Sequence, residues 1–357
     1  MPIVAHTDLP TFQRLRDEGQ NILDPDRARH QDIRELHIGL LNMMPDAALA
    51  ATERQFFRLV GESNPIAQFY VHPFTLEGLE RSAQARAYIE RYYEPFEQIR
   101  EQGLDALIVT GANVTHPDLS QEPFWEPLIE VIAWAAQEVT STLCSCLATH
   151  AVLQFQYGQH RYPLPEKRWG VYPHRVVDRT HPLVHDVNTL FDVPHSRFNE
   201  IGRHQFDAAG LWVLAESAEA GVHLAVSADG FRQVFFQGHP EYDTISLLKE
   251  YRREVRRFAS GERPDYPPFP ENYIDRKHRA ILDEHRARVV AALSQGREQP
   301  PFPEAYIARS LDNTWHDTAE GVLGNWMGLI YQVTNQSRKL PFMEGIDPGD
   351  PLGLRRR

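Results

Sequence analysis

Two short segments, far apart in the chain, carry residue types that could perform covalent chemistry. The first contains Cys146, which follows a β-branched run, Val139–Leu143, and precedes a helical pattern over Ala148–Phe155. This order predicts a buried strand that turns directly into a helix, with the thiol at the corner. Unpaired backbone N–H groups and the positive end of the helix dipole favour a thiolate there. Cys146 is therefore a candidate nucleophile, and the same N–H groups could hold an oxyanion.

A structural role for the cysteines has to be weighed against this interpretation. Free cysteine is among the most frequently buried residue types, and Cys144 takes the structural role because it lies within the predicted strand. Cys146 escapes that role only if the chain supplies a base. The chain has only two cysteines, spaced as Cys-Ser-Cys, so a disulfide would be strained and a zinc site would lack its second ligand pair. The sequence therefore predicts no disulfide and no metal centre.

The second segment contains His239 and Glu241. It directly follows a predicted hairpin formed by His223–Ser227 and Phe231–Gln237. Because Pro240 cannot donate to a strand ladder, the strand stops and both side chains project from a loop. A cysteine nucleophile needs a base, and the base needs an orienting carboxylate. His239 and Glu241 could supply both, although 17 histidines in the chain make the spacing alone weak support.

Alternating strand and helix patterns must position these segments. Strands are expected at Leu36–Leu41, Ile66–His72, Leu104–Thr110 and Val139–Leu143. Helices are expected between them at Asp46–Val60, Ser82–Gln102 and Trp125–Glu138. Near-continuous apolar strands joined by helices are typical of an α/β fold with a mostly parallel sheet and helices on both faces. Ligands of such sheets bind beyond the carboxyl ends of the strands, so three strand ends should meet: Asn42–Pro45, Thr110–Thr115 and Ser145–Leu147.

The remainder of the chain changes character. Two more strands are expected, at Gly170–Val177 and Leu211–Glu216. Three more helices are expected, at Thr244–Phe258, Arg276–Leu293 and Trp315–Gln332. The polar beginning and the end with Pro and Gly suggest three parts: an N-terminal arm over residues 1–33, one main domain over 34–335 and a C-terminal tail over 336–357.

Composition narrows the class of protein. A formal net charge of −12, with no basic run longer than the last three residues, argues against nucleic acid as a partner. No segment approaches the roughly 18 uncharged apolar residues of a membrane span, and the N-terminus lacks the pattern of an export signal. We expect a cytoplasmic protein that binds neither nucleic acid nor membrane. The oligomeric state stays open, with a homodimer as the alternative to a monomer.

The motifs together resemble the homoserine O-succinyltransferase family, which is similar in fold to class I glutamine amidotransferases, a flavodoxin-like arrangement. The matching segments run in the family's order from about residue 36 to 335, whereas residues around 275–300 look like an added helical segment towards the C-terminus. The segments are Leu40–Pro45, Leu107–Ala112, Val139–Cys146, Glu166–Tyr172, Pro194–Arg197, Gly238–Asp243 and Asn325-Trp326. Their order and spacing together make the resemblance specific.

The resemblance implies an acyltransferase of methionine biosynthesis. Cys146 would carry a succinyl group from succinyl-CoA to the hydroxyl of L-homoserine, with His239 as the base and Glu241 as its partner, and no cofactor would be bound. Two alternatives are homoserine O-acetyltransferase, which would use acetyl-CoA, and a glutamine amidotransferase or peptidase-like hydrolase with the same triad. A catalytically dead binding protein is a third, against which the intact triad argues.

The same resemblance implies where the substrates bind. Lys167, Ser196 and Arg253 fall on the family's substrate-binding positions. Thr115 and Ser196 fall on positions associated with the choice of acyl-CoA. Thr115 stands where glycine or glutamate is typical, and a glutamate there would repel the free carboxylate of a succinyl group. The resemblance therefore favours succinyl-CoA as the donor for this chain.

Overall fold

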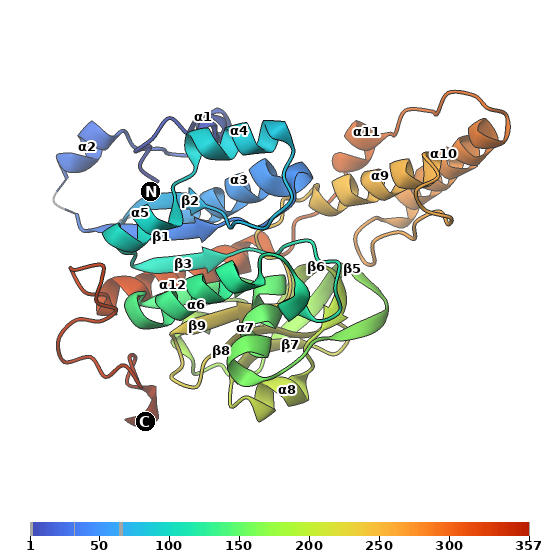
Figure 1. Cartoon of the computed structure of the whole chain (residues 1–357). Coiled ribbons are helices and arrows are strands. Elements are labelled where there is room, and N and C mark those ends of the chain that lie inside the picture. Colours follow the sequence, from blue (N-terminus) through green and yellow to red (C-terminus); the bar gives the residue numbers. More distant parts are fainter. Residues whose placement is uncertain (1–2, 32, 64–66, 357) are drawn as a thin grey trace.

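One sheet organises the molecule. The computed structural model describes residues 3–31, 33–63 and 67–356, and within these ranges nine strands form a single sheet (Figure 1). Its parallel half runs from the edge inwards as β2 (Gln68–Phe74), β1 (Glu35–Leu41), β3 (Ala106–Val109), β4 (Ser141–Ser145) and β9 (Gln233–Phe236). The antiparallel half continues from β9 as β8 (Gly221–Val226), β7 (Trp212–Ser217), β5 (Tyr162–Val176) and β6 (Leu190–Glu200).

Helices cover both faces of this sheet because the central strands are apolar on both faces. In β3, Ala106 and Ile108 join one core cluster, while Leu107 and Val109 join the other. The first cluster also receives side chains from α1 (Pro10–Asp17), α3 (Asp46–Glu62) and α12 (His316–Val333). The second receives side chains from α5 (Phe96–Gln102), α6 (Trp125–Glu138), α7 (Leu147–Tyr157) and α8 (Arg203–Ala208). The α/β fold class expected from the sequence is confirmed.

The orange segment in Figure 1 projects away from the sheet. It contains α9 (Ser246–Ala259), α10 (Arg276–Ser294) and α11 (Glu304–Ala308). Its own apolar cluster packs Leu248, Tyr251 and Leu282 against Trp169 of β5. The projection is therefore anchored on the antiparallel half of the sheet, and α9 brings its first turns close to the loop after β9.

Two expected elements differ from the structure. The helix predicted over Ser82–Gln102 is two helices, α4 (Ala83–Tyr92) and α5, because Pro95 precedes α5 with an extended backbone. Strand β6 was not expected from the sequence, and β5 begins earlier than expected. Both strands carry prolines and many exposed side chains, which conceal a period-2 pattern.

Described segments near both ends of the chain pack on the sheet. Residue Ile3 pairs with Phe69 of the edge strand β2, and α2 (Pro25–Arg29) follows α1 near this edge. After α12, Phe342 is buried in the first core cluster, and η3 (Leu354–Arg356) is the regular element of the tail within the described residues. No helix in the described ranges combines the length and apolarity needed to cross a membrane.

Candidate active site

Cys146 lies at the corner between β4 and α7. Its φ of 52° places a non-glycine residue in the left-handed region, a conformation that costs about 1–3 kcal/mol. The buried strand before it and the buried helix after it hold this conformation, and the Cys146 N–H donates to the Phe236 carbonyl at 2.7 Å. The thiol is partly exposed, whereas Cys144 is fully buried and its pKa is raised by burial. The corner thus places Cys146 at a partly exposed position and leaves Cys144 in the core.

The end of β3 lies beside this corner, as the parallel sheet predicts. A Cβ placed on Gly111 would lie 3.7 Å from the Cys146 Cβ and 3.9 Å from the Leu147 nitrogen. Leu147 is the first residue of α7, so its N–H has no acceptor within the helix. The start of α7 and the Gly111 loop therefore form a cradle beside the sulfur, suited to an oxyanion.

His239 and Glu241 come from the loop after β9 and are both buried. His239 Nδ1 lies 2.8 Å from Glu241 Oε1, and the His239 N–H donates to the Pro194 carbonyl at 2.8 Å. The ring stacks on Tyr242 with 4.4 Å between centroids. Because the carboxylate can only accept, Nδ1 carries a proton, and Nε2 is left for the hydrogen bond with Cys146.

The charges around His239 set its protonation. Burial lowers its pKa, but the negative charges of Cys146 and Glu241 and the hydrogen bonds to both raise it well above the ordinary value. The negative charges beside His239 therefore favour the protonated imidazolium form of its ring. The structure brings together the three residues that the sequence analysis selected as a triad, with the geometry of an activated nucleophile.

A buried carboxylate that the sequence analysis missed organises the neighbouring substrate positions. Glu250 on α9 accepts hydrogen bonds from Ser196 Oγ at 2.7 Å, Trp169 Nε1 at 3.0 Å and Tyr242 Oη at 2.9 Å. Lys167 Nζ lies 3.4 Å from the same carboxylate. Burial would raise the pKa of Glu250, yet Lys167 and the hydroxyl donors lower it. No motif marked it, because its role depends on residues of β5 and β6 and of the loop after β9.

This carboxylate connects the substrate positions to the triad. Tyr242 donates to Glu250 and stacks on His239, so one side chain touches both groups. Burial lowers the pKa of Lys167 while Glu250 opposes that shift. Lys167 and Ser196 are therefore adjacent, as the resemblance implies, and both are positioned by Glu250 rather than by the triad itself.

Arg253 and Thr115 occupy more open positions. Arg253 lies one turn after Glu250 on α9, about half exposed, and its charge helps to lower the pKa of Glu250. Thr115 is exposed, and its N–H donates to Glu122 Oε1 at 2.6 Å, which fixes the loop after β3. Within the described residues, no hydrogen bond joins Thr115 to Ser196. Ser196 instead donates to Glu250 on α9.

A further cation near the thiol also escaped the sequence analysis. Arg161 donates to the carbonyl groups of His116 and Pro117, at 2.8 and 3.3 Å, next to the Thr115 loop. Burial lowers the pKa of Arg161, and the charges of Glu122 and Cys146 oppose this shift. Arg161 therefore contributes positive potential to the mouth of the site. No motif marked it, because its role depends on a loop more than forty residues earlier in the chain.

Comparisons with known proteins give matches over nearly the whole chain. The family model for homoserine O-succinyltransferase matches residues 2–336. The chain is 75% identical over 354 residues to a homoserine O-succinyltransferase of Allochromatium vinosum, covering 99% of each chain. It is 68% identical over 356 residues to one of Nitrosococcus oceani, covering 100% of this chain and 99% of that one. Among solved structures, a glutamine amidotransferase from Methylobacillus flagellatus is 14% identical, with a TM-score of 0.45 over 83% of this chain and 95% of that one.

Proposed function

The chain belongs to the homoserine O-succinyltransferase family, and we propose on this premise how it transfers a succinyl group from succinyl-CoA to the hydroxyl of L-homoserine. The observation that carries the proposal is the strained corner at Cys146, hydrogen-bonded to the buried pair His239 and Glu241. This arrangement supports a two-step transfer through an acyl-enzyme in methionine biosynthesis.

In the first step, the Cys146 thiolate attacks the thioester carbonyl of succinyl-CoA. A carbon–sulfur bond forms, and the carbonyl oxygen becomes an oxyanion that the N–H groups at Leu147 and the Gly111 loop can stabilise. The intermediate collapses by breaking the bond to the sulfur of CoA. The departing CoA thiolate takes the proton of the His239 imidazolium. A succinyl thioester on Cys146 and a neutral His239 remain.

In the second step, the neutral His239 acts as the base. Its Nε2 takes the proton from the homoserine hydroxyl as the oxygen attacks the succinyl thioester. The second tetrahedral intermediate expels the Cys146 thiolate and releases O-succinylhomoserine. The imidazolium that forms is stabilised by the Glu241 carboxylate, which also holds the ring orientation. The starting thiolate and imidazolium are restored, so atoms and charge balance without a metal or bound cofactor.

The positions around Glu250 suit the amino-acid substrate. Arg253 offers a planar guanidinium near the Glu250 cluster that can pair in a bidentate manner with the homoserine carboxylate. Lys167 and Ser196, both held by Glu250, can donate to polar atoms of the substrates. Because Glu250 also bonds Tyr242, homoserine bound here would lie next to the triad.

The mouth of the site suits a donor with a free carboxylate. Thr115 is uncharged and its hydroxyl can donate to a carboxylate, while Arg161, bound to carbonyl groups of the same loop, supplies positive potential. We therefore assign donor choice to Thr115 with Ser196, as the family positions imply. We also propose a cytoplasmic enzyme that acts on small molecules only, with residues 34–335 as the catalytic domain, 1–33 as an arm and 336–357 as a tail.

Mass spectrometry of the enzyme mixed with succinyl-CoA alone tests the proposal. We expect one added succinyl group on the peptide that contains Cys146, and its removal when homoserine is added. Turnover without that adduct would mean direct transfer between the substrates. Release of ammonia from glutamine at a rate comparable to acyl transfer would instead favour the amidotransferase alternative.

A further inference from the structure

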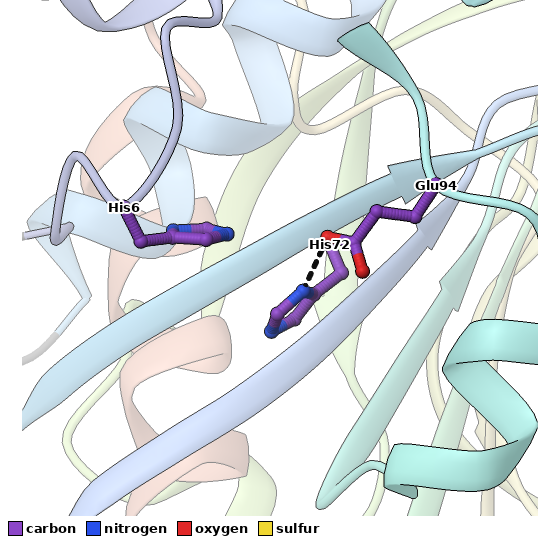
Figure 2. Close-up of side chains that lie close together, drawn as sticks. All are labelled: His6, His72 and Glu94. Atoms are coloured by element: carbon purple, nitrogen blue, oxygen red, sulfur yellow. Dashed lines mark hydrogen bonds and ion pairs between the residues drawn. The ribbon is translucent and has the colours of Figure 1, made fainter.

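Three side chains of metal-ligand type converge at the edge of the sheet, on elements that the reaction does not use. His72 lies on the edge strand β2, His6 lies on the segment before α1, and Glu94 lies between α4 and α5. One ligand atom from each residue lies within 4.8 Å of the others. Figure 2 shows the His6 ring directed across β2 towards His72 and Glu94. Three separate parts of the chain therefore meet at one point.

The hydrogen bonds of His6 leave a lone pair unused. His6 Nδ1 lies 3.1 Å from the Val4 carbonyl, which can only accept, so Nδ1 carries the proton. Nε2 then bears a lone pair, and this atom is buried without a hydrogen-bond partner among the described residues. A buried acceptor without a donor is rare in native proteins. A ring whose Nδ1–H is fixed by a backbone carbonyl and whose Nε2 is free has the tautomer of a metal ligand.

The polar contacts next to His6 also lack one hydrogen. Four side chains form a line of three polar contacts: Glu94 Oε1 to His72 Nδ1 at 2.6 Å, His72 Nε2 to His37 Nδ1 at 2.9 Å, and His37 Nε2 to Glu35 Oε1 at 3.0 Å. Each contact needs one hydrogen. Two neutral imidazoles have only two hydrogens on nitrogen, and carboxylates have none. The line is therefore one positive charge short.

One cation removes both deficits. If it occupies the place of the missing hydrogen between His72 Nδ1 and Glu94, then His72 Nε2–H donates to His37 Nδ1 and His37 Nε2–H donates to Glu35. Every contact in the line is then satisfied with neutral rings. The same cation can accept the lone pair of His6 Nε2. An extra proton on His72 would complete the line but would leave His6 Nε2 unpaired, so a multidentate cation accounts for more of the geometry.

We propose that His6, His72 and Glu94 bind a divalent transition-metal ion, with Zn²⁺ as the ion that best matches two imidazoles and one carboxylate. Ligands of a tetrahedral zinc lie about 3.4 Å apart at bond lengths of about 2.1 Å. Small side-chain rotations reach this spacing from the present one, and water supplies the fourth ligand. The His37 and Glu35 pair completes the outer hydrogen bonds that fix a metal-bound histidine.

Such a site has a structural purpose. Ile3 pairs with Phe69 of the edge strand β2 through a single isolated bridge, and the Val4 N–H donates to the Phe69 carbonyl at 2.9 Å. A metal held by His6 and His72 would fasten this segment to the strand and cover an otherwise open sheet edge. The site does not depend on the proposed acyl transfer, because none of its ligands lies in the triad or in the Glu250 cluster.

Metal analysis of the full-length enzyme tests the site. The protein is stripped of metal with EDTA, incubated with ZnSO₄ and dialysed. Elemental mass spectrometry then measures the amount of zinc per chain. We expect one retained zinc per chain and a higher melting temperature than that of the stripped protein. With CoCl₂, visible d–d absorption typical of tetrahedral cobalt is expected. A wild-type protein that retains no metal would overturn the inference and would leave the extra proton as the explanation.

Variants locate the bound ion. His6→Phe keeps a stacking ring but removes the lone pair, and Glu94→Gln removes the carboxylate, so each should weaken zinc binding at least about 100-fold. His37→Phe removes only an outer hydrogen bond and should weaken zinc binding about 10-fold. His30→Gln is the matched control, since His30 is an exposed histidine outside the group. Equal zinc binding by wild type and His6→Phe would contradict the proposed ligands, even if a His72 variant failed to fold.

Discussion

Three buried histidines lie close to Gly238, namely His195, His223 and His239, yet their pKa values move in opposite directions. His239 is raised well above the ordinary value, whereas His195 and His223 are lowered well below it. Burial lowers the pKa in all three cases. Only His239 has negative partners, Cys146 and Glu241. The positive charge of His239 in turn lowers the pKa of His195 and of His223. Partner charge rather than depth therefore decides which imidazole is protonated.

The inner histidines also show what a satisfied neutral group looks like. Arg197 Nε donates to His195 Nδ1, His195 Nε2 donates to His174 Nε2, and His174 Nδ1 donates to the Tyr172 carbonyl. Each contact has one hydrogen with both rings neutral. The line at the sheet edge through His72 and His37 lacks one hydrogen by the same count. Neutral rings can thus form a complete network in one place and require a cation in another.

Removing the Cys146 sulfur should have the largest effect, on both the activity and the pKa of His239. Cys146→Ala should lower kcat/KM for acyl transfer by at least about 10⁴-fold, because no nucleophile remains. The pKa of His239 should fall towards those of its neighbours, which NMR titration of the ring can follow. Cys144→Ala is the matched control, since that thiol is buried in the core, and it should keep most of the activity. Comparable losses in the two variants would contradict Cys146 as the acyl carrier.

Glu241→Gln should also reduce the difference in pKa between His239 and the neutral histidines, because it removes the second negative partner of His239. The amide keeps the shape but removes the negative charge that stabilises the imidazolium, so the pKa of His239 should fall. We expect kcat to drop by about 10²- to 10³-fold in both half-reactions. Stopped-flow measurement of CoA release and of homoserine turnover separates the two. A variant that retained full activity would show that Tyr242 stacking alone positions His239.

The neutral histidines should make the fold sensitive to acid. Burial lowers the pKa of His174 to about 4, below the value of about 6.5 for an unfolded histidine. Between these values the unfolded state binds more protons, so stability is full above about pH 6.5 and falls as the pH is lowered to about 4. His174 alone accounts for about 3 kcal/mol. Urea unfolding at pH 7 and pH 4 measures this loss, and a smaller loss in His174→Phe would assign it.

A negative charge at the exposed position Thr115 should change the choice of acyl donor. Thr115→Glu should shift the ratio of kcat/KM for succinyl-CoA over acetyl-CoA towards acetyl-CoA by about 10-fold or more, because two carboxylates would meet in a partly dry site. Thr115→Gln has a similar size without the charge and is the matched control. Steady-state assays with both donors measure the ratio. An equal shift in both variants would indicate that size rather than charge selects the donor.

Arg253 should give the smallest effect, because an exposed ion pair is screened by water. Arg253→Lys keeps the charge but loses the bidentate fork, so KM for homoserine should rise about 10-fold. Formation of the succinyl-enzyme should remain unchanged. Arg257→Lys, on the same helix and similarly exposed, is the control. A variant weakened equally in both half-reactions would point to a structural role for Arg253 on α9.

Much of the catalytic end could be predicted because its signals are local. Cys146 is marked by the strand before it and the helix after it, and His239 by the strand that Pro240 stops. Because β3 and β4 are parallel neighbours, their carboxyl ends meet at the same edge of the sheet, where ligands of such sheets bind. Strands β5 and β6 escaped prediction because prolines and exposed side chains hide their alternation, although their pairing is extensive.

By itself, the sequence determined the α/β pattern, the corner at Cys146 and the family to which the chain belongs, because each depends on residues close together in the chain or in a fixed order. Only the tertiary structure decided that Glu250 gathers Lys167 and Ser196, and that His6 meets His72 and Glu94. These groups join residues tens of positions apart. Their hydrogen bonds and charges come into being only when folding removes the residues from water and leaves each polar atom to its new neighbours.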